Sequence, residues 1–120
     1  MSRDRIAGVV LAAGPSRRFG KQPPKPLARF RGEPLVRRVV AAALASRLSE
    51  VVVVLGRAAH EVREALAGLD IEIVENPRFR EGQSTSVRKG LAAVEAEVAA
   101  AMFLPVDQPQ LSTEVIDQLV

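Results

Sequence analysis

The chain has 120 residues, within the range of one domain, and its 48% hydrophobic and 26% charged residues are typical of a globular protein rather than a disordered one. Its 17 basic and 14 acidic residues leave a net charge of only +3, so we expect no nucleic-acid partner. The absence of cysteine excludes disulfides and thiolate metal sites and agrees with a cytoplasmic location. No apolar run approaches the roughly 20 residues of a membrane-spanning helix, and no signal-peptide pattern is present, so we expect no membrane partner.

The first part of the chain alternates between strand and helix patterns. Residues 6–12 are a short apolar run, which predicts a strand buried on both faces. From Pro34, apolar residues recur at helical spacing as far as Leu48 and predict a helix. Residues 51–55 are a mostly β-branched run that predicts a second strand. A second helix is then indicated by the spacing of Val62, Leu66 and Leu69.

The alternation continues in the second part. Residues 71–74 and 100–104 predict a third and a fourth strand, with a helix between them from about Ser84 to Val94. The apolar positions of this helix are Val87, Leu91 and Val94. Ser112 or Thr113 is suited to cap a last helix. The pattern predicts a Rossmann-like three-layer α/β/α fold around an open, mostly parallel sheet.

Ligands of such folds bind beyond the carboxyl ends of the strands, so we expect the chemistry after Leu11, Val74 and Leu104. The last apolar helical stripe stops with the chain, without a capping signal. We therefore expect residues 1–120 to be part of a single domain that is truncated at its C-terminus.

A glycine-rich, basic loop of about 20 residues connects Gly14 to the helix at Pro34, and loops of that length are usually either functional or disordered. Glycine lets backbone N–H groups approach a phosphate closely. The loop lacks the P-loop spacing, because five residues separate Gly14 from Gly20 and Lys21 is not followed by a hydroxyl residue. Its prolines also exclude the dinucleotide fingerprint, which opens a helix directly. A phosphate-bearing small molecule fits its cluster of cations.

The segment Leu11-Ala12-Ala13-Gly14-x-Ser16-x-Arg18-x-Gly20, followed by Lys25-x-Leu27, resembles the signature of the MobA-like nucleotidyltransferases. The resemblance implies that the glycine-rich backbone wraps a nucleoside triphosphate. It also implies that Arg18 and Lys25 are catalytic residues that neutralise the triphosphate, with Lys21 as an alternative to Lys25.

A second block runs from Asn76 through Gly82, Ser84 and Ser86 to Gly90. A purely structural interpretation makes the hydroxyls of residues 84–86 ordinary helix caps. The segment also resembles the family block that lies beside the base and ribose. In that case Asn76, Gly82, Ser84 and Ser86 belong to the nucleotide site, where they read the base through hydrogen bonds.

A third block, Leu104-Pro-Val-Asp107-Gln-Pro, places a carboxylate after the fourth strand. A lone aspartate is more often a turn residue. The block resembles the family motif whose aspartate holds a metal, and the resemblance implies that Asp107 is the Mg²⁺ ligand. Mg²⁺ is typically bound by one or two carboxylates together with substrate phosphates.

His60 lies away from the apolar face of its helix and is expected to be an exposed surface residue.

The resemblance implies a nucleotide-diphospho-sugar transferase-like fold and a magnesium-dependent nucleotidyltransferase. It is nearest to the molybdenum cofactor cytidylyltransferases, which implies transfer of CMP from CTP, favoured over GTP, to a phosphate-bearing acceptor such as molybdopterin, with release of pyrophosphate. Two alternatives stay open. The acceptor could be a sugar phosphate or methylerythritol phosphate, or the chain could be a nucleotide-binding module without turnover.

Overall fold

The computed structural model describes residues 5–12, 25–94, 98–106 and 112–119. Its main sheet has four parallel strands in the order β5-β4-β1-β6. Their bounds are β1 Ile6–Ala12, β4 Glu50–Leu55, β5 Glu72–Glu75 and β6 Ala100–Pro105. The four strands predicted from apolar runs are confirmed, and so is the open, parallel α/β sheet.

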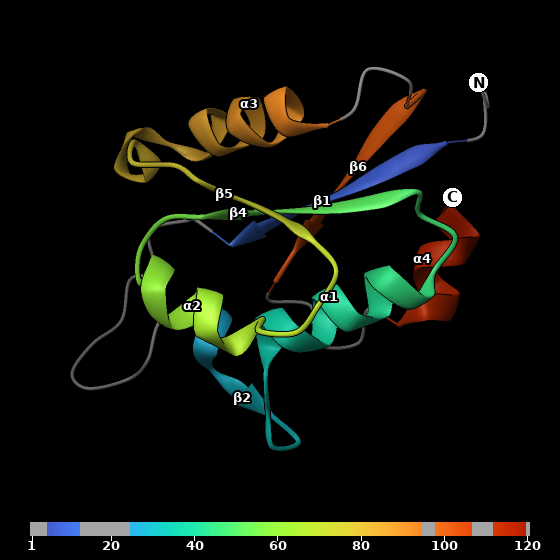
Figure 1. Ribbon diagram of the computed structural model, residues 1–120, viewed down its shortest axis with the longest axis horizontal. Helices are drawn as coiled ribbons and strands as arrows, with labels where there is room; N and C mark the ends of the chain where they lie inside the picture. The colour runs from blue at the N-terminus through green and yellow to red at the C-terminus, as the bar shows by residue number, and fades with distance from the viewer. Residues whose placement is uncertain (1–4, 13–24, 95–97, 107–111, 120) are drawn as a thin grey trace.

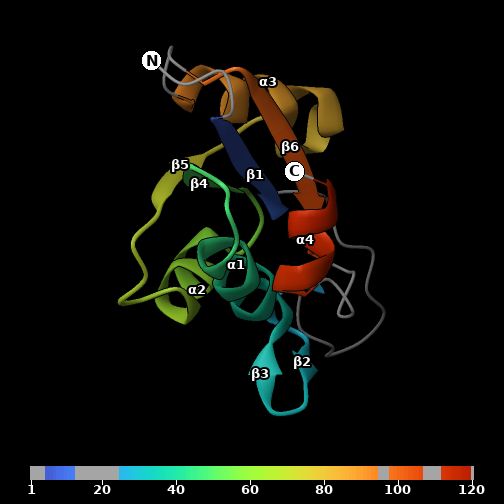
Figure 2. The same cartoon turned by 90° about the vertical axis from the view of Figure 1, so that its right-hand side faces the viewer.

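Helices cover both faces of this sheet, as Figures 1 and 2 show. On one face lie α1 Leu35–Ala45, α2 Ala59–Ala65 and α4 Thr113–Leu119, and on the other lies α3 Gln83–Ala93. The strand order explains this division, because α1 and α2 precede strands added outward from β1, whereas α3 leads back across the sheet to β6. Right-handed connections that run in opposite directions place their helices on opposite faces. The predicted three-layer fold is confirmed.

Alternation along the strands divides the core into two clusters. Val53 and Leu55 of β4 face α1 and α2, while Val52 and Val54 face α3. The continuous apolar runs in the sequence therefore reflect strands that are buried on both faces. The cluster on the α1 side is much the larger of the two.

The helix α3 contacts the sheet through residues without large side chains. A Cβ atom placed on Gly90 would lie 2.5 Å from Cγ1 of Val9 and 3.1 Å from Cγ2 of Val54, so the backbone of α3 approaches β1 and β4 closely. Ser86 and Gly90 are the buried residues of the helix. The prediction that Leu91 belongs to its apolar face is wrong, since Leu91 is 48% exposed. The close approach at Gly90 turns the adjacent side chain outward.

The segment before α1 is more ordered than the single long loop that the sequence predicts. It contains a 3-10 turn, η1 Lys25–Leu27, and a short antiparallel hairpin of β2 Arg29–Phe30 and β3 Glu33–Pro34. At the tip of the hairpin Arg31 and Gly32 have φ angles of 55° and 87°. Positive φ at both central residues is the requirement of a tight hairpin turn that matches strand twist. The Arg-Gly pair is a weaker signal of such a turn than Asn-Gly, and the prolines favoured a loop.

The start of α4 confirms the predicted cap, because the backbone N–H of Val115 donates to Oγ of Ser112 at 3.2 Å. Thr113 Oγ1 donates to the carbonyl oxygen of Ala42 at 3.0 Å and ties α4 to α1. His60 is an exposed residue as expected, with 81% of its side chain accessible. None of the helices in the described ranges is long and apolar enough to cross a bilayer.

Candidate functional site

The carboxyl ends of all four strands meet at one edge of the sheet, because the strands are parallel. Leu55 at the end of β4 is paired with Ala12 of β1 on one side and with Glu75 of β5 on the other. Leu11 is paired with Pro105 of β6. The strand order reverses between β1 and β6, and in open α/β sheets the ligand crevice lies at such a reversal. The candidate site therefore lies where β1 and β6 end.

The glycine-rich loop leaves the sheet at this reversal. Leu11 and Ala12 are the last residues of β1, and Ala12 is buried against the α1-side core. Lys25 begins η1, so its backbone is described. Its side chain is outside the described part of the structure, as are Ala13, Gly14, Ser16, Arg18, Lys21 and Gly20. The assigned roles of these residues stay predictions.

The aspartate predicted as metal ligand follows the neighbouring strand. Pro105 ends β6 and Val106 is buried, at 6% exposure. Asp107 itself lies outside the described residues. Because Pro105 is paired with Leu11, the segments that carry Asp107 and the glycine-rich loop start from adjacent strands. In the described ranges, no group of at least three His, Cys, Asp or Glu side chains is arranged to hold a metal ion.

The second predicted block is a hydrogen-bonded unit built around Asn76, the first residue after β5. Asn76 is only 3% exposed, and its Nδ2 donates to Oγ1 of Thr85 and to Oγ of Ser86, both at 2.9 Å. Its Oδ1 accepts from the backbone N–H of Arg78 at 3.0 Å. The backbone N–H of Asn76 donates to the carbonyl oxygen of Leu55 at 2.7 Å. These bonds fix the start of α3 against the carboxyl ends of β4 and β5.

The purely structural interpretation of the sequence, in which the hydroxyls of residues 84–86 cap the helix, is wrong. Gly82 occupies the cap position, with φ 117° and ψ 161°, a conformation that favours glycine. A Cβ on Gly82 would meet no atom of the described residues within 4 Å, so a ligand can approach its backbone. Ser84 is exposed, whereas Ser86 is 2% exposed and bonded to Asn76. Of the predicted residues in this block, Gly82 and Ser84 are thus the accessible ones.

Thr85 is a residue that the sequence analysis missed. Its Oγ1 accepts from Asn76 and lies 2.7 Å from the carbonyl oxygen of Gly82 and 3.0 Å from that of Arg78. Nothing in the sequence distinguishes Thr85 from the serines on either side of it. Only the folded turn shows which of the three hydroxyls joins the connection to the helix.

An exposed ion pair closes the turn η2 Phe79–Glu81 that leads into α3. Arg78 Nε lies 3.0 Å from each carboxylate oxygen of Glu81, and its Nη2 lies 2.6 Å from Oε1. Hydrogen bonding to Arg78 lowers the pKa of the Glu81 carboxyl, and the same bond with the carboxylate charge raises the pKa of Arg78. Both groups face solvent, so the pair orders the turn more than it stabilises the fold.

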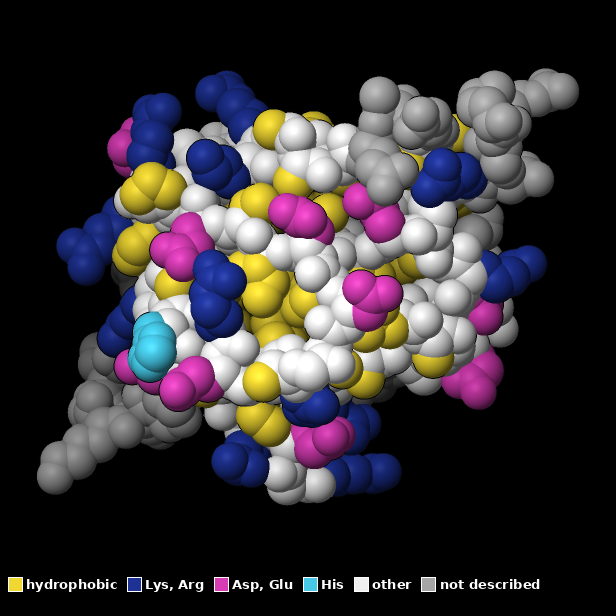
Figure 3. Space-filling view, in the orientation of Figure 1, with side chains coloured by type: hydrophobic (Ala, Val, Ile, Leu, Met, Phe, Trp, Pro, Cys, Tyr) yellow, Lys and Arg dark blue, Asp and Glu magenta, His cyan; other side chains and the backbone are white. Residues whose placement is uncertain are grey.

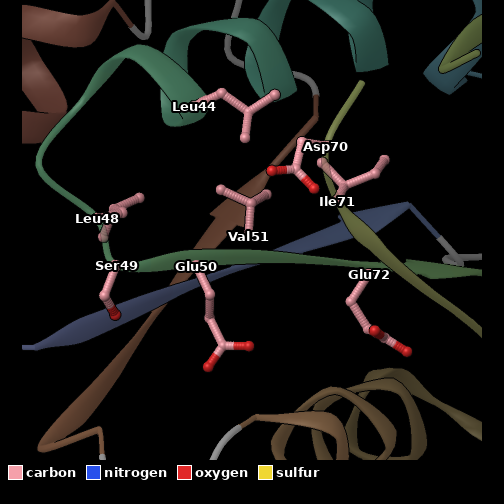
Figure 4. Close-up of a pocket in the computed structure, with 8 residues that line it drawn as sticks. All are labelled: Leu44, Leu48, Ser49, Glu50, Val51, Asp70, Ile71 and Glu72. Atoms are coloured by element: carbon pink, nitrogen blue, oxygen red, sulfur yellow. The ribbon is translucent and has the colours of Figure 1, made fainter. Parts of the chain in front are cut away.

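A hollow of about 320 Å³ lies at the opposite edge, where β4 and β5 begin. Three acidic residues line it, Glu50, Asp70 and Glu72, together with Leu44 of α1 and the apolar side chains of Leu48, Val51 and Ile71. In Figure 4, Glu50 and Glu72 extend to one side of the strands and Asp70 lies on the other side with Leu44 and Ile71. Its carboxylates do not converge, and their charge repels a polyphosphate. This hollow does not fit the predicted ligand.

The topology and the strand-order reversal define a doubly wound α/β domain with a ligand edge at the carboxyl ends of its strands. Residues 8–120 match the family described as the MobA-like NTP transferase domain. The chain belongs to this family, and the resemblance noted in the sequence is confirmed.

The chain is similar to two curated relatives with different names. The chain is 32% identical to a probable molybdenum cofactor guanylyltransferase of Bacillus cytotoxicus, with 95% of this chain and 55% of the relative covered. It is 37% identical to a nicotine blue oxidoreductase of Paenarthrobacter nicotinovorans, with 96% of this chain and 55% of the relative covered. The chain therefore spans about half the length of these relatives.

The fold also matches solved structures. A Mycobacterium tuberculosis H37Rv protein superposes with a TM-score of 0.84 at 30% identity, covering 98% of this chain and 59% of that one. The same protein in complex with manganese gives a TM-score of 0.73 at 30% identity, covering 96% of this chain and 57% of that one. A structural neighbour thus binds a divalent cation.

Proposed function

We propose that residues 1–120 form the nucleotide-binding part of a nucleotidyltransferase domain. The observation that carries this proposal is the pairing of Leu11 with Pro105 at the reversal of strand order. Because of this pairing, the glycine-rich loop and the segment that carries Asp107 follow adjacent strands. The family match over residues 8–120 supports the reaction class. A cytoplasmic location fits the cysteine-free composition.

In the proposed reaction a phosphate oxygen of the acceptor attacks the α-phosphorus of a nucleoside triphosphate. The bond from the α-phosphorus to the bridging oxygen breaks, and pyrophosphate leaves. Arg18 and Lys25 stabilise the charge on the triphosphate and on the departing pyrophosphate, and the backbone N–H groups of Gly14 and Gly20 bind phosphate oxygens. Leu11, Ala12, Ala13 and Ser16 complete the phosphate-binding loop, which contributes through positioning and charge rather than through a covalent nucleophile.

The block after β5 supplies the contacts to the base. Gly82 and Ser84 are accessible and are the proposed contact groups. Asn76 and Ser86 are buried and bonded to each other, so they belong to the site as positioning residues that hold Gly82 in place.

Asp107 is the proposed magnesium ligand. Its carboxylate is a hard oxygen donor, which suits Mg²⁺, and it lies two residues beyond the strand that pairs with the start of the phosphate loop. The bound cation would offset the charge of the triphosphate.

Among the nucleotides we favour CTP over GTP, and among the acceptors molybdopterin, because the Leu-Ala-Ala-Gly opening and the Asp107-Gln-Pro block resemble the cytidylyltransferases. Pyrophosphate release should be measured with each nucleoside triphosphate against molybdopterin, a sugar phosphate and methylerythritol phosphate. Turnover with CTP and molybdopterin is the expected result. If only the sugar phosphate or methylerythritol phosphate is turned over, that compound replaces molybdopterin as the proposed acceptor. Nucleotide binding without release of pyrophosphate would favour a non-catalytic module.

Asp107→Asn tests the metal site within this reaction. We expect magnesium-dependent nucleotide binding to be lost and turnover to fall roughly 100-fold or more, because the charge of the ligand is removed. Asp70→Asn, the same change at the opposite edge of the sheet, is the matched control and should keep the response to magnesium. Calorimetry with and without Mg²⁺ measures both, and an unchanged response in Asp107→Asn would remove Asp107 from its role.

A second candidate is a redox function, since the relative that is 37% identical is named an oxidoreductase. It predicts that no nucleoside triphosphate yields pyrophosphate with any acceptor. Detection of pyrophosphate excludes it.

A further inference from the structure

A second hollow, of about 240 Å³, lies beside the connection from β5 to α3. Its walls are the segment Asn76–Arg78 and one face of α3, made of Thr85, Arg88, Lys89 and Ala92. Arg88, Lys89 and Ala92 lie three, four and seven positions after Thr85, which places all four residues along one side of the helix. The volume is below the roughly 300 Å³ of common ligand pockets, so the hollow suits one small chemical group.

The wall formed by residues 76–78 is held rigidly. Asn76 binds the backbone N–H of Arg78 through Oδ1 and reaches Thr85 through Nδ2. Thr85 Oγ1 also lies 3.0 Å from the carbonyl oxygen of Arg78. Because these bonds join the wall to the helix directly, the shape of the hollow is set before any ligand binds.

The charge of the hollow is positive. Arg78, Arg88 and Lys89 line it, and none of the described residues in its wall is acidic. Arg78 pairs with Glu81, whereas Arg88 and Lys89 form no ion pair with any residue that the structure describes. Figure 3 shows Lys and Arg side chains gathered over the end of the molecule where η2 and α3 begin. Two cations without an ion-pair partner among the described residues, beside a small preformed hollow, attract an anion.

We propose that this hollow binds a phosphate group of a small molecule. Arg88 offers a guanidinium fork and Lys89 an ammonium, and both form charge-assisted hydrogen bonds to phosphate oxygens. The methyl side chain of Ala92 leaves the space between them open. No motif in the sequence assigns a ligand to Arg88, Lys89 or Ala92, although Asn76 of the second block contributes to the opposite wall. The site does not depend on the nucleotidyl transfer proposed above.

Titration of the 120-residue chain with inorganic phosphate, followed by ¹H–¹⁵N NMR at constant ionic strength, tests the site. The backbone amide signals of Arg88, Lys89 and Ala92 should shift and saturate. The double variant Arg88→Gln, Lys89→Gln should weaken binding by at least about tenfold, since hydrogen bonds to charged groups are lost. Glu81→Gln, which releases Arg78, should tighten binding about two- to fivefold.

Arg80→Gln is the matched control, because Arg80 carries the same charge nearby but lies over the ring of Phe79 and does not line the hollow. Its phosphate affinity should change less than about twofold. If phosphate affinity fell equally in Arg80→Gln and in the Arg88, Lys89 double variant, the attraction would come only from the overall positive charge of the surface. That result would overturn the proposal. Absence of saturable shifts would overturn it as well.

The phosphate can belong to the nucleotide or to a separate metabolite. If CTP displaces inorganic phosphate from the hollow, as followed by the amide signals of Arg88 and Lys89, the hollow binds a phosphate of the nucleotide. If both bind together, it belongs to a second molecule. Either result retains the phosphate site, while failure of CTP to bind anywhere would contradict the proposed function and leave the phosphate titration intact.

Discussion

The sheet face under α1, α2 and α4 is filled with branched apolar side chains, whereas the face under α3 is closed by a helix whose buried residues are Ser86 and Gly90. On the first face, packing of side chains supplies the stability. On the second, a close backbone approach at Gly90 and the hydrogen bonds of Asn76 hold the helix. The difference suggests that the α1 side keeps the domain folded, and that the α3 side positions groups at the ligand edge.

Two adjacent valines of β4 separate the contributions of the two faces to stability. Val53 faces the large cluster and Val54 the small one, and both are fully buried. We expect Val53→Ala to lower the free energy of unfolding by about 2–3 kcal/mol and Val54→Ala by nearer 1 kcal/mol, because the cost depends on how well the surroundings collapse. Urea unfolding measures both. Equal losses would show that the two faces contribute alike.

Replacing Asn76 tests the polar side. Asn76→Ala leaves the hydroxyl of Ser86 and the backbone N–H of Arg78 without their partner, so we expect a loss of about 1–3 kcal/mol in thermal or urea unfolding. The exposed Ser84 is the control, since Ser84→Ala should change stability by less than about 0.5 kcal/mol. A loss for Asn76→Ala no larger than that of the control would contradict the role of the network.

Much of the fold was predictable, because the strands are continuous apolar runs and the order of strands and helices follows from them. Ile6–Ala12 coincides with the predicted first strand. The α3 side was predicted less well. Leu91 matches helical spacing but points outward, since Gly90 brings the backbone against Val9 and Val54. The period of a sequence cannot reveal how closely two backbones approach.

The candidate site was predictable in position but not in detail. Parallel strands bring their carboxyl ends to one edge, so the motifs after Leu11 and Leu104 had to lie near each other. Which hydroxyl of the block after β5 is buried depends on the turn geometry around Asn76, which spacing does not encode. Likewise, Arg88 and Lys89 line a hollow only because residues 76–78 form its opposite wall.

The smallest effect is expected at the exposed pair of Arg78 and Glu81. Hydrogen bonding to Arg78 lowers the pKa of the Glu81 carboxyl, so the stabilisation is present above the pKa of the unfolded chain and is lost as the pH falls through the folded pKa. NMR titration of the Glu81 side-chain carbon should give a lower midpoint in the wild-type chain than in Arg78→Gln. Identical midpoints would contradict the pairing.

We propose that the nucleotide binds at the carboxyl ends of the strands, at the reversal between β1 and β6. Titration with CTP and Mg²⁺, followed by ¹H–¹⁵N NMR, tests it most directly. We expect the amide signals of Leu11, Ala12, Gly82 and Val106 to shift, with those of Glu50 and Glu72 unchanged. Shifts confined to Glu50, Glu72 and their neighbours at the opposite edge would contradict the account.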